Sequence, residues 1–455
     1  MKFVSPDTIR TYFSLAMSDM YKKEVPQYGT LVELVNEAND AARKADPELD
    51  RRIRDNEEEE RLDLERHGAI RIGTGTELRN MKRLFAVMGM FPVGYYDLSV
   101  AGMPIHSTAF RPHGKQSLRN NPFRVFTSLL RPDLLEDPQL AKLAKEILSR
   151  RNIFTDKCIA LIGKAEKQGG LDEQDAKEFV KEALETFRWH SEATVSAEIY
   201  ETFRSAHTLV ADIVCFKGPH INHLTPRTLD IDAVQEGMPK KGITPKAIIE
   251  GPPHRKVPIF LRQTSFRALK EPIAFQTTSG VVAQNGTHTA RFGEIEQRGM
   301  ALTPKGRALY DKLLLETRSS IQLKGDGSNA HEYMEKLENI FSAFPDDESV
   351  LRREGYGYFH YKATGKKGSP KTTDMEKLIE QGFVEATPIT YEDFLPVSAA
   401  GIFQSNLGDE SQKNFEGNAN YSAFKEDLGC EVIDSDKLYQ DEQNQSIELV
   451  LKELA

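Results

Sequence analysis

The sequence predicts an α+β fold, in which a strand-rich core is interrupted and decorated by helices. Segments with strand-like composition, rich in Val, Ile, Thr and Phe, lie in residues 67–130 and again in residues 211–299. A block with helical periodicity, residues 132–208, separates the two regions. The connections between strands are long and irregular, unlike the even alternation of a doubly wound sheet.

Residues 1–45 are expected to be helical. Ser5 and Pro6 open a run in which apolar side chains recur at helical spacing, and a second amphipathic stretch runs from Thr30 to Ala38. Residues 47–66 are densely charged, which is typical of a solvated helix face.

The first strand-rich region reads as strand, helix, strand. We expect a strand from His67 to Thr74, a helix from Glu77 to Met88 and a strand from Pro92 to Leu98. Ser107–Phe110 and Phe123–Leu130 are further strand candidates.

The block that follows is expected to contain helices over residues 138–149 and 155–167. A third helix begins at Asp172, whose run of apolar residues falls on one face. Trp189 closes the block and is interpreted as a packing residue.

In the second half, strand-like text begins at Ala211 (ADIVCF), Lys256, Pro272 and Thr287, and a helix is expected over Arg307–Thr317. The chain from about residue 325 is more hydrophilic and ends in a helical tail. Four segments follow: 1–131, N-terminal helices and the first part of the core; 132–208, a helical insertion; 209–324, the second part of the core; and 325–455, a C-terminal segment packing on the core.

Composition excludes several classes of function. The 455 residues carry a net charge of −9, which argues against wrapping nucleic acid and against an anionic membrane surface as main partner. Hydrophobic residues make up 39%, enough for a sizeable core, and the most apolar stretch, residues 84–96, is too short to span a bilayer. Cys158, Cys215 and Cys430 lie far apart and no secretory signal is visible, so we expect a cytoplasmic protein.

Nucleotide-binding and nucleophile motifs are absent from the sequence, so candidate sites are sought among polar residues in strand text. His67 and Arg71 would share one face of a strand, about 13 Å apart. Such a pair either brackets a short dianion or consists of two surface side chains.

Two other places carry candidates. His220 and His223 stand in a loop after an apolar run, where either could be a metal ligand or a plain loop residue. Glu294, Glu296 and Arg298 share one strand face, as an exposed charged ladder or with one carboxylate pointing into a site. Two His and one carboxylate together are the set with which non-haem Fe(II) keeps three positions open.

Long stretches of the chain resemble one family. The segments RHGAIRIGT (66–74), LFAVMGMFPVGYYDLS (84–99), HSTAFRP (106–112), FKGPHINHLTPRTLDID (216–232) and RFGEIEQRGMALTPKGRALYDKLL (291–314) closely resemble the 2-oxoadipate dioxygenase/decarboxylase family, which forms 2-hydroxyglutarate in lysine catabolism. The likeness extends to VSAAGIFQSN (397–406). It implies a vicinal-oxygen-chelate-like fold, a curved β-sheet around a metal with large helical insertions.

The resemblance also implies a site. Its metal is Fe(II), and the ligands fall on His67, His223 and Glu294, with Glu296 as the alternative carboxylate because its strand parity is the same. The substrate-binding Arg falls on Arg71, expected to anchor the distal carboxylate during catalysis. A further substrate contact falls on Val397 and Ser398.

The activity so implied is oxidative decarboxylation of 2-oxoadipate by O2, followed by hydroxylation of the same molecule to 2-hydroxyglutarate. The partners are then a small 2-oxo dicarboxylic acid and O2, with no nucleic acid and no membrane. Two alternatives are a glyoxalase-like metal-dependent lyase or isomerase, which would turn over without O2, and a non-catalytic binding protein on the same fold. Chain-length preference, product stereochemistry, the role of His220 and oligomeric state cannot be read from the sequence.

Overall fold

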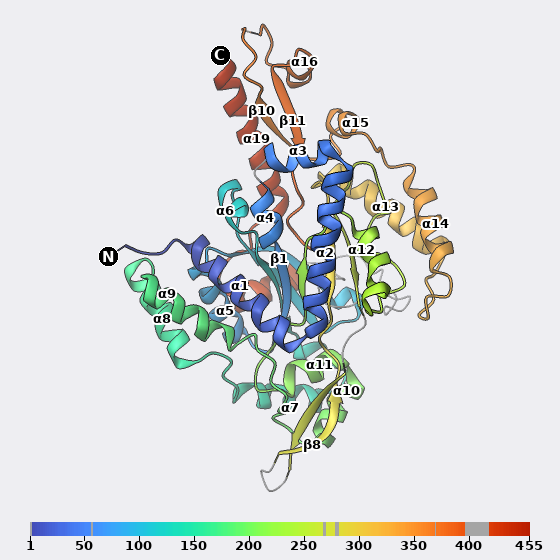
Figure 1. Cartoon of the computed structure of the whole chain (residues 1–455). Helices are drawn as coiled ribbons and strands as arrows, with labels where there is room; N and C mark the ends of the chain where they lie inside the picture. The colour runs from blue at the N-terminus through green and yellow to red at the C-terminus, as the bar shows by residue number, and fades with distance from the viewer. Residues whose placement is uncertain (1, 56–57, 267–269, 278–281, 369, 396–417) are drawn as a thin grey trace. The chain divides into compact units, whose positions relative to one another are not determined.

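The computed structural model describes residues 2–55, 58–266, 270–277, 282–368, 370–395 and 418–455 (Figure 1). The chain forms two compact units from interleaved stretches. Unit 1 comprises Met1–Lys246, Ser265–Ile295 and Pro396–Ile433, and unit 2 comprises Ala247–Thr264, Glu296–Leu395 and Asp434–Ala455. The four consecutive segments predicted from the sequence are a different partition, and their role as domains stays a prediction.

Unit 1 is built on a five-stranded sheet with the strand order β2-β3-β4-β1-β5. The strands are β1 (Arg66–Ile72), β2 (Phe91–Asp97), β3 (Ile105–Arg111), β4 (Arg124–Leu130) and β5 (Leu224–Pro226). β1 runs parallel to β4, whereas the other neighbouring pairs are antiparallel. Every residue of β3 and β4 is buried, so both faces of the sheet are covered.

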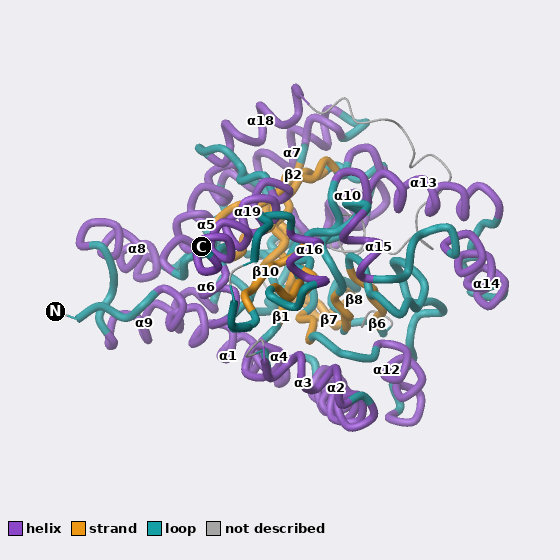
Figure 2. Tube along the Cα trace, turned by 90° about the horizontal axis from the view of Figure 1, so that it is seen from above, coloured by secondary structure: helices purple, strands orange, loops and turns teal. Residues whose placement is uncertain are grey.

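The predicted helices of unit 1 are present, and polar side chains cap several of them. The side chains of Ser5, Thr155 and Asp172 each accept a hydrogen bond from a backbone N–H in the first turn of the helix that follows. α9 packs against α1 and α8, as Figures 1 and 2 show. The helices are α1 (Pro6–Glu24), α2 (Pro26–Ala45), α3 (Pro47–Asp55), α4 (Glu59–Leu64), α5 (Gly75–Val87), α6 (Lys115–Asn120), α7 (Pro138–Ser149), α8 (Asp156–Gln168), α9 (Glu173–Leu184), α10 (Ala197–Ala206), α11 (Thr208–Val214), α12 (Ile231–Gly237) and α18 (Asn418–Leu428), with 3-10 turns η1 (Ser99–Ala101), η2 (Pro132–Leu134) and η3 (Met238–Lys241).

One predicted strand was wrong. The apolar run that begins at Ala211 lies in helix α11, not in a strand. His207 precedes this helix, and its side chain accepts a hydrogen bond from the backbone N–H of Leu209. Leu209 to Val214 are all buried, and a short run with no polar face cannot be assigned to helix or strand by periodicity.

The later strands differ in extent from those that the sequence predicts. They are β6 (Leu261–Ser265), β7 (Glu271–Gln276), β8 (Val282–His288) and β9 (Glu294–Arg298). β7 and β8 form a hairpin, and β6 pairs with β9. The stretch predicted as one strand from Thr287 onward is divided between β8 and β9, because residues 289–293 are irregular.

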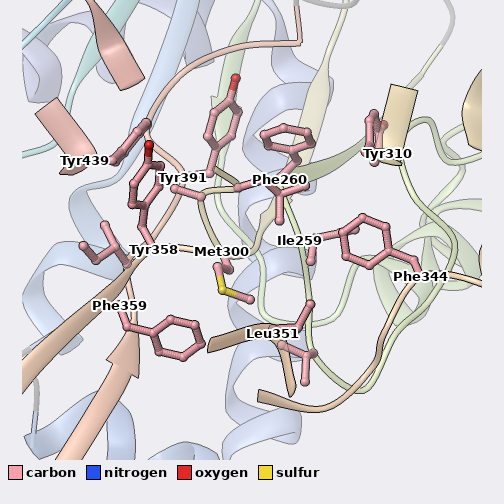
Figure 3. Packing of buried hydrophobic residues seen from close by; sticks show 14 of the residues in the cluster. Ile259, Phe260, Met300, Tyr310, Phe344, Leu351, Tyr358, Phe359, Tyr391 and Tyr439 are labelled. Atoms are coloured by element: carbon pink, nitrogen blue, oxygen red, sulfur yellow. The ribbon is translucent and has the colours of Figure 1, made fainter. Parts of the chain in front are cut away.

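Unit 2 has a hydrophobic core of its own, rich in aromatic side chains (Figure 3). Phe260 belongs to this core and packs edge-on against the rings of Tyr310 and Tyr391. The elements are α13 (Pro304–Ser320), α14 (Ala330–Phe341), α15 (Glu348–Arg353), β10 (Phe359–Ala363), α16 (Met375–Glu380), β11 (Val384–Pro388) and α19 (Ser435–Leu454). Among the described residues, no helix combines the length and apolarity needed to cross a membrane.

Candidate metal centre

The regular strand β1 brings His67 and Arg71 to the same face of the sheet. Side chains on a strand alternate, so these residues point to one side while Gly68 and Ile70 point to the other. On the neighbouring strand β5, Thr225 stands directly opposite His67. His223 lies two residues before Thr225, at the start of the same extended segment.

Three buried side chains converge at this face. The carboxylate Oε1 of Glu294 lies 3.0 Å from His67 Nε2 and 3.3 Å from His223 Nδ1. All three side chains are fully buried. One ligand atom from each lies within 4.8 Å of the other two, a separation that a single metal ion can bridge. The structure thus brings together the three residues that the sequence singled out as ligands.

The hydroxyl of Thr225 orders this cluster. It donates to Glu294 Oε1 at 2.9 Å, so it is left to accept from His223 Nδ1 at 3.0 Å. Nδ1 of His223 therefore carries the ring proton, and Nε2 presents a lone pair. Nε2 is buried and has no hydrogen-bond partner within the described part of the chain. A ligating His whose other ring N–H is held by a neighbour is the usual arrangement at a metal.

Glu294 carries a negative charge at neutral pH. Burial raises its pKa, but the adjacent imidazole of His223 and the hydrogen bond from His67 outweigh that effect and lower the pKa to about 2. A buried carboxylate with two imidazoles is a suitable set for a divalent transition metal. The residues present therefore fit such an ion.

The alternative carboxylate, Glu296, has a different partner. It receives two hydrogen bonds from Arg298, at 2.9 and 3.1 Å, and both side chains are fully buried. Glu296 belongs to unit 2, whereas Glu294 and both histidines belong to unit 1. Of the two carboxylates, Glu294 is the one found beside His67 and His223.

His220 and Arg71 meet a different acid. Nη1 of Arg71 donates to Asp212 Oδ2 at 2.7 Å, and Nε2 of His220 lies 3.5 Å from Asp212 Oδ1. Arg71 is nearly buried, with 10% of its side chain exposed. His220 thus stands outside the group of three ligands, next to the partner of Arg71.

With this geometry in place, comparisons with known proteins decide the family. A family model described as 2-oxoadipate dioxygenase/decarboxylase matches residues 13–406. This chain belongs to the 2-oxoadipate dioxygenase/decarboxylase family. A protein of that name from Pseudomonas putida is 57% identical over 98% of this chain and 97% of its own length. One from Escherichia coli is 54% identical over 97% and 98%.

A solved structure agrees with the family assignment. The hydroxyglutarate synthase from Pseudomonas putida, crystallised with 2-oxoadipate, superposes with a TM-score of 0.92 at 55% identity. The match covers 100% of this chain and 99% of that one. This chain therefore has the fold of that structure, and the predicted α+β class is confirmed.

Two of the predicted substrate contacts, Val397 and Ser398, lie outside the described residues. Sequence reasoning missed two residues that lie next to the candidate site residues, Thr225 and Asp212. Thr225 could have been found, because it has the strand parity of His223. Asp212 carried a weaker signal, a single acid within an apolar run.

Proposed function

We propose that this protein is an Fe(II)-dependent dioxygenase that converts 2-oxoadipate and O2 into 2-hydroxyglutarate and CO2. The observation that carries the proposal is the buried convergence of His67, His223 and Glu294 in a chain 57% identical to a 2-oxoadipate dioxygenase/decarboxylase. The reaction balances with no further reductant. One oxygen atom enters the new carboxylate and the other enters the hydroxyl group.

His67, His223 and Glu294 would hold the metal, and the two-His, one-carboxylate set favours Fe(II) among the common ions. When bound, the metal supplies the chelation of the 2-oxo acid and the redox chemistry with O2. Thr225 keeps Nε2 of His223 deprotonated and directs the carboxylate of Glu294.

Arg71 would bind the far carboxylate of the substrate. It stands four residues along β1 from His67, about 13 Å away by strand geometry, so it can set the position of the carbon chain. Its planar fork of N–H donors suits a carboxylate. Val397 and Ser398 stay the proposed additional substrate contacts.

We also propose a cytoplasmic location. Cys158, Cys215 and Cys430 are all free thiols, which is typical of a reducing compartment.

The test is oxygen uptake by protein loaded with Fe(II) under anaerobic conditions and then given 2-oxoadipate and ¹⁸O2. We expect stoichiometric O2 consumption, and mass spectrometry should find two labelled oxygen atoms in 2-hydroxyglutarate and none in the CO2. His67→Ala should abolish the reaction. His331→Ala is the matched control, because the His331 side chain is 88% exposed and should not affect turnover.

Two outcomes would contradict the proposal. Loaded protein that consumes no O2 with 2-oxoadipate excludes the self-hydroxylation of this substrate. Turnover of an oxo acid with Zn(II) in the absence of oxygen would instead support the lyase alternative.

A further inference from the structure

Asp212 is a buried acid held by several side chains that take no part in the metal centre. It lies on α11, and 4% of its side chain is exposed. Oδ2 accepts from Arg71 Nη1 at 2.7 Å, and Oδ1 accepts from His288 Nε2 at 2.9 Å. Asp212 thus joins the guanidinium on β1 to the end of the β7–β8 hairpin.

The histidine behind Asp212 is itself fixed. Since Nε2 of His288 donates to the carboxylate, Nδ1 is the acceptor for the hydroxyl of Tyr200 at 2.8 Å. The ring of Trp189 lies nearly parallel to that of His288, at 9° with centroids 6.1 Å apart. Tyr200, His288, Asp212 and Arg71 therefore form one continuous hydrogen-bonded chain, with Trp189 packed over it.

A second contact holds the same guanidinium. With its amide oxygen turned toward them, Asn222 accepts from Arg71 Nη1 at 3.1 Å and from His220 Nε2 at 3.2 Å. His220 in turn packs edge-on against Trp189, with centroids 4.8 Å apart. Asn222 immediately precedes His223, so the segment that carries a candidate metal ligand also helps to orient Arg71.

Asp212 is an anion at all ordinary pH values. Burial raises its pKa, but His220, the hydrogen bond from His288 and the charge of Arg71 together hold the pKa far below its usual range. A buried carboxylate of this kind orients a cation strongly, because both charges lie in a medium of low dielectric constant.

We propose that Asp212 is a positioning residue for substrate, which holds the Arg71 guanidinium in the orientation that receives the far carboxylate of the dicarboxylic acid. A guanidinium carries five N–H donors in a rigid fork and can serve two carboxylates at once. Fixing its rotamer fixes the distance between the metal and the far binding point, so Asp212 also contributes to chain-length selectivity. The inference rests on the proposed function.

The test compares two acids of equal chain length, 2-oxoadipate and 2-oxohexanoate, of which only the first has a far carboxylate. Dissociation constants are measured calorimetrically on anaerobic, Fe(II)-loaded protein, and kcat and KM for 2-oxoadipate are measured with O2. Asp212→Asn should weaken 2-oxoadipate binding by about 10- to 100-fold, chiefly as a higher KM. Binding of 2-oxohexanoate should stay within about twofold of wild type.

A milder variant covers the case in which Asp212→Asn does not fold. Tyr200→Phe removes only the hydroxyl that holds His288, and it should weaken 2-oxoadipate binding several-fold with no effect on 2-oxohexanoate. Tyr28→Phe is the matched control, because Tyr28 is also a buried tyrosine of unit 1 and its hydroxyl meets Ser18 at 3.2 Å, outside this network.

The outcomes separate the inference from the proposed function. Equal losses for both acids would mean that Asp212 acts on folding or on the metal centre, and would overturn the positioning role. Unchanged binding of 2-oxoadipate in both variants would overturn it as well. In either case, turnover of 2-oxoadipate by the wild-type protein would leave the proposed function standing.

Discussion

Replacing Thr225 with Val is expected to weaken Fe(II) binding without unfolding the protein. The change keeps the shape of the side chain but removes the hydroxyl that donates to Glu294 and accepts from His223. His223 could then rotate, and its ring could carry the proton on Nε2, the atom proposed to bind the metal. The substitution therefore affects the metal through two of its three proposed ligands.

The size of the effect follows from the contacts. The bond to Glu294 joins a hydroxyl to a buried carboxylate whose pKa is about 2, and such charge-assisted bonds contribute about 1.5–3 kcal/mol. Since about 1.4 kcal/mol corresponds to a tenfold change in affinity, the Fe(II) dissociation constant should rise by about 10- to 100-fold.

Anaerobic competition against a chromophoric Fe(II) chelator measures this constant directly. Thr127→Val is the matched control. Thr127 is fully buried in the same sheet and pairs with Ile70, on the face that points away from His67. Its hydroxyl has no hydrogen-bond partner among the described residues. The control should bind Fe(II) as the wild type does. If Thr225→Val also binds within about twofold of wild type, the role assigned to the hydroxyl is wrong.

Two further predictions concern the sheet, and a third concerns helix α2. Burial lowers the pKa of His106 to about 4. The imidazole is therefore protonated near pH 6.5 in the unfolded chain but only near pH 4 in the folded one. The free energy of unfolding therefore falls as pH falls through this window, by about 3 kcal/mol once the pH is below both pKa values. Urea titrations at pH 7 and 4.5 should show a smaller loss of stability in His106→Leu than in the wild type. An equal loss in the two proteins would refute the role given to His106. Gly68→Ala would place a Cβ 2.5 Å from Ile221 Cδ1 and 2.8 Å from the backbone oxygen of His223, so calorimetry should find unfolding easier by about 1–3 kcal/mol and metal binding weaker. Gly29→Ala, where nothing lies within 4 Å of the new Cβ on α2, should instead raise stability by up to about 1 kcal/mol.

Part of the site can be predicted from the sequence, because it depends on local periodicity. His67 and Arg71 could be placed on one face because β1 is regular from Arg66 to Ile72 and side chains on a strand alternate. The helices of residues 138–184 could also be predicted from the sequence, because each has an apolar stripe and a capping side chain at its start. These features depend only on neighbours in the chain.

The remaining features depend on contacts between distant segments. Glu294 and Glu296 have the same strand parity, so periodicity cannot separate them. Only the tertiary partners, His67 and His223 for one and Arg298 for the other, do so. Asp212 was hidden in a run that reads as a strand, and its partner Arg71 is 141 residues away.

The three proposed ligands are far apart in the chain but belong to one structural unit. His67 and Glu294 are separated by 227 residues, so no short fragment contains the site, and closing so long a loop has an entropic cost that only the folded sheet offsets. All three lie in unit 1. By mass action, a metal that binds only the folded form shifts the unfolding equilibrium of the part that contains its ligands. Loading with iron should consequently raise the unfolding temperature of unit 1. The aromatic core around Phe260 in unit 2 should unfold at the same temperature as in the metal-free protein.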